Sequence, residues 1–238
     1  MHVPDGFLDV PTSVATGAVA VAGVSLALRG ARRELDDRTA PMAGLAAAFV
    51  FATQMLNFPV GAGTSGHLLG GALAAVLVGP WTAVLCLSVV LLVQSLLFAD
   101  GGITALGTNI TLMGLVGVVV GWLVFRGLQR LLPKRVGLVP AVAAVAAFVS
   151  VPVTALAFVG LYVVGGQAPV PLDTLTAAML GWHTVIGLGE AAITGLVVGS
   201  VVSVRPDLVH GARRVLAARP LEVRTAPKSA PAPVEGVS

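Results

Sequence analysis

The sequence predicts an all-α integral membrane protein, a bundle of about seven transmembrane helices. Hydrophobic residues make up 56 % of the 238 residues and charged residues 11 %, whereas soluble domains average about 45–50 % and about 25 %. The mean hydropathy is +0.96. We therefore expect the chain to cross a lipid bilayer several times. The basic residues are not interleaved with polar or aromatic surface, so the net charge of +3 does not indicate a nucleic-acid partner.

The apolar runs give the positions of the helices. A transmembrane helix needs about 20 apolar residues, or fewer where it is short or re-entrant. The third run is short and rich in glycine, and Gly79-Pro80 is its break from the fourth. The seventh run is long enough to tilt or to project beyond the bilayer. The predicted spans, in order, are 11–28, 41–58, 67–80, 81–99, 104–125, 138–165 and 174–203.

The connecting segments account for the other boundaries. The basic stretch 29–38 follows the first run, and the glycine-rich loop 59–66 follows the second. Asp100 opens the turn between the fourth and fifth runs, and the basic stretch 126–135 separates the fifth from the sixth. Asp173 precedes the seventh run.

The positive charges predict the orientation. All 14 lysine and arginine residues fall in three stretches, 29–38, 126–135 and 205–228. Seven spans place all three on one face, which the positive-inside rule makes cytoplasmic. The N-terminus then lies outside and the C-terminus in the cytoplasm. An even number of spans would separate the last stretch from the other two.

Two regions follow from this pattern. Residues 1–204 form the predicted transmembrane domain, and residues 205–238 form a cytoplasmic tail rich in proline and alanine. We expect the tail to be disordered, with a helix over 206–218 as an open alternative.

The N-terminus is a candidate metal-binding segment. Nothing before His2 resembles a signal peptide, so we expect the free amine of Met1 to be kept. That amine, the next backbone amide and the His2 imidazole can close adjacent chelate rings on one ion. His67 lies in a glycine-rich loop on the same predicted side. Such an all-nitrogen set suits Ni(II), Co(II) or Cu(II).

Other polar residues are expected to surround these ligands. Glu190 and His183 lie seven residues apart on one face of the last span, and an ionisable group there is a functional hypothesis by default. We expect a structural polar network at this face, with direct ligation by His183 as the alternative. The candidate supporting residues are Asp5, Asn57, Ser65, Asp100, Asn109 and His183.

Several motifs resemble the substrate-capture membrane subunits of energy-coupling factor transporters for cobalt and nickel, the CbiM/NikM family. The resemblance covers about residues 1–204 and leaves out the tail. In that family the metal is held by the N-terminal amine, by the backbone nitrogen and imidazole of the second residue, and by the histidine of a TSGH loop. Those positions are Met1, His2 and His67 here. The motifs are MHVPDGF at 1–7, NFP at 57–59, GTSGHLLGG at 63–71, LFADGGITALG at 97–107 and the segment from GWH to GE at 181–190.

The resemblance implies a function and partners. A subunit of this kind captures Co(II) or Ni(II) in a prokaryotic cell membrane, and the sequence does not choose between the two metals. It works with a transmembrane coupling subunit, two cytoplasmic ATPases and often a small accessory membrane protein. The chain has no GxxxxGK[ST] phosphate loop, so we expect it to bind no ATP and to have no enzymatic activity of its own.

The alternative is a rhomboid-like intramembrane serine protease. The segment Gly63-Thr64-Ser65-Gly66 fits a GxSG pattern, with Ser65 as nucleophile and His183 as base. This interpretation leaves the Met1-His2 start without a role. Replacing Ser65 separates the two functions, because it would abolish proteolysis and spare metal binding.

Overall fold

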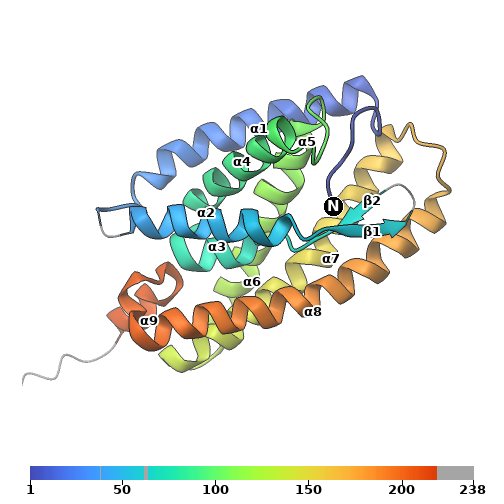
Figure 1. Cartoon of the computed structure of the whole chain (residues 1–238). Helices are drawn as coiled ribbons and strands as arrows, with labels where there is room; N and C mark the ends of the chain where they lie inside the picture. Colours follow the sequence, from blue (N-terminus) through green and yellow to red (C-terminus); the bar gives the residue numbers. More distant parts are fainter. Residues whose placement is uncertain (38, 62–63, 219–238) are drawn as a thin grey trace, which may run out of the picture.

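The computed structural model describes residues 1–37, 39–61 and 64–218 and shows a bundle of helices (Figure 1). The α-helices and strands are α1 (Val10–Ala31), α2 (Ala40–Gln54), β1 (Phe58–Gly61), β2 (Thr64–Gly66), α3 (Gly71–Val78), α4 (Pro80–Leu97), α5 (Leu106–Asn109), α6 (Val118–Leu131), α7 (Val139–Gly165), α8 (Leu172–Val204) and α9 (Arg213–Ala217). A π-helix, η1 (Ile110–Gly117), joins α5 to α6, and the 3-10 turns are η2 (Val136–Leu138), η3 (Pro206–Leu208) and η4 (His210–Ala212).

Each of the seven predicted runs contains a helix, but only five helical stretches of the described chain are long and apolar enough to cross a membrane. The two that fall short are α2, with 15 residues, and α3, with 8. Every residue of α3 is buried. A helix that is apolar all round can be surrounded by protein as well as by lipid, which is why hydropathy alone counted α3 as a span.

The glycine-rich loop forms a short β-hairpin, which the all-α prediction did not include. β1 and β2 are antiparallel, with Phe58 opposite Gly66 and Pro59 opposite Ser65. Glycine and proline disfavour helix in this stretch. The chain then runs through His67 to Gly70, which has a left-handed φ of 76° and begins α3. The hairpin therefore presents the loop before α3 to one end of the bundle.

That end also holds the N-terminal segment. Leu8 forms an isolated antiparallel bridge with Gly166 after α7, and Val3 O accepts a hydrogen bond of 3.0 Å from Gly102 N. Figure 1 shows the N-terminus beside the hairpin.

The three basic stretches meet at the opposite end. Gln129 Nε2 at the end of α6 donates to Gly211 O at 2.8 Å. The Arg213 guanidinium lies 3.5 Å from Glu34 O in the segment after α1. The three stretches thus lie together, while the face that meets the cytoplasm remains a prediction.

The packed part of the chain extends beyond the predicted domain boundary. Residues 206–217 form η3, η4 and α9, and Val209, Ala212 and Val215 are buried against the bundle. The segment expected as either disordered tail or helix is therefore folded up to α9. Residues 219–238, the rest of the predicted tail, lie outside the described residues.

Candidate metal centre

The N-terminal segment is buried in the mouth of the bundle. Met1 and Val3 have no exposed surface, and His2 is 5 % exposed. The side chain of Asn109 holds the main chain of Val3 from both sides: its Oδ1 accepts from Val3 N at 2.7 Å, and its Nδ2 donates to Val3 O at 3.1 Å. These bonds satisfy the polar main chain of a segment that has left water.

A glycine turn makes this close approach possible. Gly101 has a left-handed φ of 89°, and a Cβ there would lie 3.1 Å from both His2 Cδ2 and Asn109 Nδ2. A Cβ on Gly102 would lie 2.4 Å from Asp5 N. Only glycine allows the loop to lie directly against the segment that carries His2.

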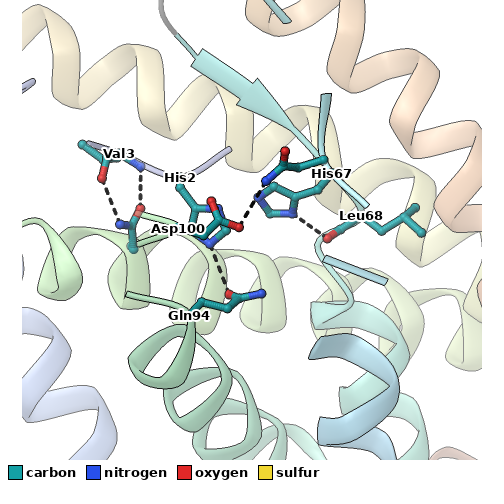
Figure 2. Close-up of polar contacts among 8 residues, drawn as sticks. His2, Val3, His67, Leu68, Gln94 and Asp100 are labelled. Atoms are coloured by element: carbon teal, nitrogen blue, oxygen red, sulfur yellow. Dashed lines mark hydrogen bonds and ion pairs between the residues drawn. The ribbon is translucent and has the colours of Figure 1, made fainter. Parts of the chain in front are cut away.

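The structure brings His2 and His67 together. Their ring centroids are 4.5 Å apart, with the ring planes inclined by 30° (Figure 2). His2 Nδ1 lies 3.1 Å from Asp100 Oδ1, and its Nε2 lies 3.2 Å from Gln94 Oε1. The two imidazoles thus lie beside each other at the N-terminal segment.

His67 keeps one ring nitrogen available. Its Nδ1 lies 2.8 Å from Leu68 O, which has no proton to give, so Nδ1–H is the donor. Its Nε2 is buried and has no hydrogen-bond partner among the described residues. A buried nitrogen lone pair without a partner fits a metal ligand.

Burial lowers the pKa values of the candidate ligands. It lowers the pKa of the Met1 amine to about 4, although the charge of Asp100 opposes this shift. Burial is also the main cause of the lowered pKa of His2 and of His67, and the amine charge lowers both further. Burial acts to raise the pKa of Asp100, but its hydrogen bond to His2 and the His2 charge make the net shift downward.

Three of the predicted supporting residues act on the main chain or on Asp100. Asn109 holds Val3, as described, and Asn57 Nδ2 donates to Asp100 Oδ2 at 3.2 Å. Asp5 is exposed and accepts from Thr104 N at 2.8 Å. It therefore fastens the N-terminal segment to the loop after α4.

Ser65 and His183 do not form a catalytic pair. Ser65 lies in β2 opposite Pro59. His183 Nδ1 donates to Met179 O at 2.8 Å, and its Nε2 has no hydrogen-bond partner among the described residues. His183 is buried close enough for its charge to act on the His67 pKa.

The sequence prediction missed two glutamines. Gln94 in α4 contacts His2, and Gln54 in α2 donates through Nε2 to Leu69 O at 2.7 Å. Both have no exposed surface. An amide side chain inside an apolar run could have indicated these two residues, because a buried polar group requires a hydrogen-bond partner.

The side chains near His2 and His67 do not by themselves make up a typical metal site. In residues 1–37, 39–61 and 64–218, no three His, Cys, Asp or Glu side chains are arranged to hold a metal ion. A metal ion at His2 and His67 would therefore need donors other than a third side chain of these types. The Met1 amine and the His2 amide are the nearest such atoms by covalent connection.

The comparisons with known proteins point to metal transport. Residues 2–208 match the family CbiM, described as "Cobalt uptake substrate-specific transmembrane region". Cobalt transport protein CbiM of Sorangium cellulosum is 34 % identical over 210 residues, or 87 % of this chain and 82 % of that protein. Fused nickel transport protein NikMN of Rhodobacter capsulatus is 37 % identical over 221 residues, or 88 % of this chain and 64 % of that protein.

A solved structure agrees. A crystal structure of a transition metal transporter has a TM-score of 0.78 and 33 % identity to this chain, covering 86 % of this chain and 93 % of that one. Fold and matches together define a multi-pass membrane component of a metal transport system. The chain belongs to the CbiM family of cobalt and nickel transport components, which are transport proteins and not enzymes.

Proposed function

We propose that this chain captures Co(II) or Ni(II) at its outer face, as the substrate-specific subunit of an energy-coupling factor importer. The ion is held by four nitrogens: the Met1 amine, the His2 amide, His2 Nδ1 and His67 Nε2. The observation that carries the proposal is the contact of the His2 and His67 rings, 4.5 Å apart, at a buried N-terminus.

Covalent geometry supports the first three donors. The amine and the amide of His2 close a five-membered ring on one ion, and the amide and Nδ1 close a six-membered ring. In the tautomer that would bind the ion, the ring proton lies on Nε2 and donates to Gln94 Oε1, so Nδ1 offers its lone pair in place of the proton that it gives to Asp100 without the ion. Nitrogen donors in a plane are typical of Ni(II) and Cu(II), and nitrogen sites also take Co(II).

Asp100 has a role in the absence of the ion as well as in its presence. Its Oδ1 lies 3.1 Å from His2 Nδ1. This nitrogen is the one that we propose as a ligand of the ion. The negative charge of Asp100 attracts a cation and offsets part of the positive charge that the ion brings into a buried site. Asn57 holds the second oxygen of this carboxylate.

ATP-driven delivery requires partners. The proposal includes a transmembrane coupling subunit, two cytoplasmic ATPases and a small accessory membrane protein, which together release the ion to the cytoplasm. The gathering of the basic stretches at the end opposite His2 supports an outward-facing metal site.

Metal titration of the purified chain tests the capture role. We expect one Co(II) or Ni(II) per chain in the wild type, and a loss of affinity of at least about 10-fold in His67→Ala, as for removal of a metal-site group. His210→Ala is the matched control, because His210 lies against Trp122 at the basic end. Equal affinity in His67→Ala and the wild type would contradict the proposed site.

A further inference from the structure

Glu190 in α8 is buried and binds the main chain directly after His67. Its Oε2 accepts from Leu69 N at 2.6 Å, and its Oε1 accepts from Gly70 N at 3.0 Å. The residue is 2 % exposed. Burying a carboxyl group costs free energy unless it is hydrogen-bonded, and here both oxygens are used on two successive amides.

One peptide group connects Glu190 to His67. The amide N–H that donates to Glu190 Oε2 belongs to the peptide between Leu68 and Leu69. The carbonyl of that same peptide, Leu68 O, accepts from His67 Nδ1 at 2.8 Å. Since a peptide group is planar and rigid, the orientation that Glu190 imposes on the N–H also sets the direction of the carbonyl.

A second element holds the next peptide. Gln54 Nε2 from α2 donates to Leu69 O at 2.7 Å. Gly70 follows with its left-handed φ of 76°, and a Cβ there would lie 2.7 Å from Val50 Cγ2 in α2. The loop after His67 is therefore clamped between α2 and α8.

We propose that Glu190 is a positioning residue for the metal site and acts on His67 through the Leu68–Leu69 peptide. The relay keeps the proton of His67 on Nδ1, fixes the ring direction and leaves Nε2 for the ion. Metal-binding histidines commonly donate their other ring N–H to a carboxylate or a carbonyl, and loss of such a partner typically costs about 10- to 100-fold in affinity. Here a carboxylate acts on the carbonyl through one peptide group. The inference rests on the proposed function.

Glu190→Gln tests the relay with little change in shape. The amide can accept from one N–H only and presents its own N–H groups to the other, so the Leu68–Leu69 peptide loses its fixed orientation. We expect the affinity for Ni(II) to fall by about 10- to 100-fold.

Glu34→Gln is the matched control. Glu34 accepts from Trp81 N at 3.2 Å and Thr82 N at 2.7 Å at the start of α4, at the basic end of the bundle. This variant loses the same kind of hydrogen bond, so it tests whether general loosening of the bundle weakens binding. We expect it to bind Ni(II) as the wild type does.

A double-mutant cycle tests whether Glu190 affects metal binding through His67 or only by stabilising the fold. In a His67→Ala background, Glu190→Gln should cause no further loss of affinity, because there is no ring left to position. The visible spectrum of Ni(II) bound to Glu190→Gln should also move toward that of His67→Ala. An equal loss in both backgrounds, with a spectrum like the wild type, would overturn the relay.

The outcomes distinguish this inference from the proposed function. If His67→Ala binds Ni(II) weakly while Glu190→Gln binds it normally, the capture site stands and the relay is wrong. If His67→Ala binds as the wild type does, both are wrong. Should Glu190→Gln fail to fold, Gln54→Ala provides the test: a smaller loss that disappears in the His67→Ala background supports the relay, and an equal loss in both overturns it.

Discussion

The side-chain amide of Asn109 makes two hydrogen bonds to the main chain of Val3: its Oδ1 accepts from Val3 N at 2.7 Å, and its Nδ2 donates to Val3 O at 3.1 Å. This pair joins the N-terminal segment to the junction of α5 and the π-helix η1. Isolated π-turns are frequent at functional sites. The contact fixes the buried N-terminal segment in one place inside the bundle.

Asn109→Ala should therefore release the N-terminal segment. The buried amide of Val3 loses its only described acceptor, and an unsatisfied buried group costs about 1–3 kcal/mol. We expect the Ni(II) affinity to fall by about 10-fold, since 1.4 kcal/mol corresponds to a factor of 10. Calorimetric titration measures it. Gln129→Ala is the control: it removes an amide side chain that donates to the main-chain carbonyl of Gly211 at the basic end, so it should leave the Ni(II) affinity near that of the wild type.

Gly101→Ala should weaken metal binding through contact with His2. A Cβ at Gly101 would lie 3.1 Å from His2 Cδ2 and from Asn109 Nδ2, in addition to its unfavourable φ of 89°. Gly6→Ala is the matched control, because Gly6 has a φ of 73° and its Cβ would have nothing within 4 Å. Both variants carry a left-handed backbone cost of about 1–2 kcal/mol. Titration should show a larger loss for Gly101→Ala, and equal losses would refute a steric role.

Metal affinity should depend less steeply on pH than in a free Met-His-Val peptide. An amine with its ordinary pKa of 8.0 must lose a proton before it binds a metal at neutral pH, whereas burial has already lowered the pKa of the Met1 amine to about 4. Release of the amide proton is common to both and cancels. From pH 8 down to pH 6 the amine of the peptide passes from half unprotonated to about 1 % unprotonated, so the peptide should lose about 50-fold more affinity than the protein over this range. Titrations at pH 8, 7 and 6 test this, and parallel curves would show that the amine is not held neutral.

Ser65→Ala should bind Ni(II) as the wild type does. Ser65 lies in β2 opposite Pro59, and no nucleophile is needed for metal capture. The measurement is the same titration, accompanied by a cleavage assay on a model membrane substrate. Proteolysis that disappears in this variant would support the protease alternative instead.

The sequence predicted which segments carry the candidate ligands, but it did not predict the features that depend on how the helices pack. The Met1-His2 start and the His67 loop could be placed on one side because charges and apolar runs determine which segments share an end. The burial of α3 could not be predicted, since a run of small and apolar residues is compatible with lipid and with protein. The roles of Gln54, Gln94 and Glu190 depend on contacts between distant helices, which the order of residues does not contain.

The amine of Met1 is the central claim, and it can be tested directly. Cobalt and nickel are measured by elemental analysis in the purified chain that starts at Met1 and in a version with one residue added before it. The added residue displaces the amine from the chelate and has no room in a site where Met1 is fully buried. We predict near-stoichiometric metal in the first protein and little in the second, with both folded. Equal metal in the two proteins would contradict the account and remove the amine from the site.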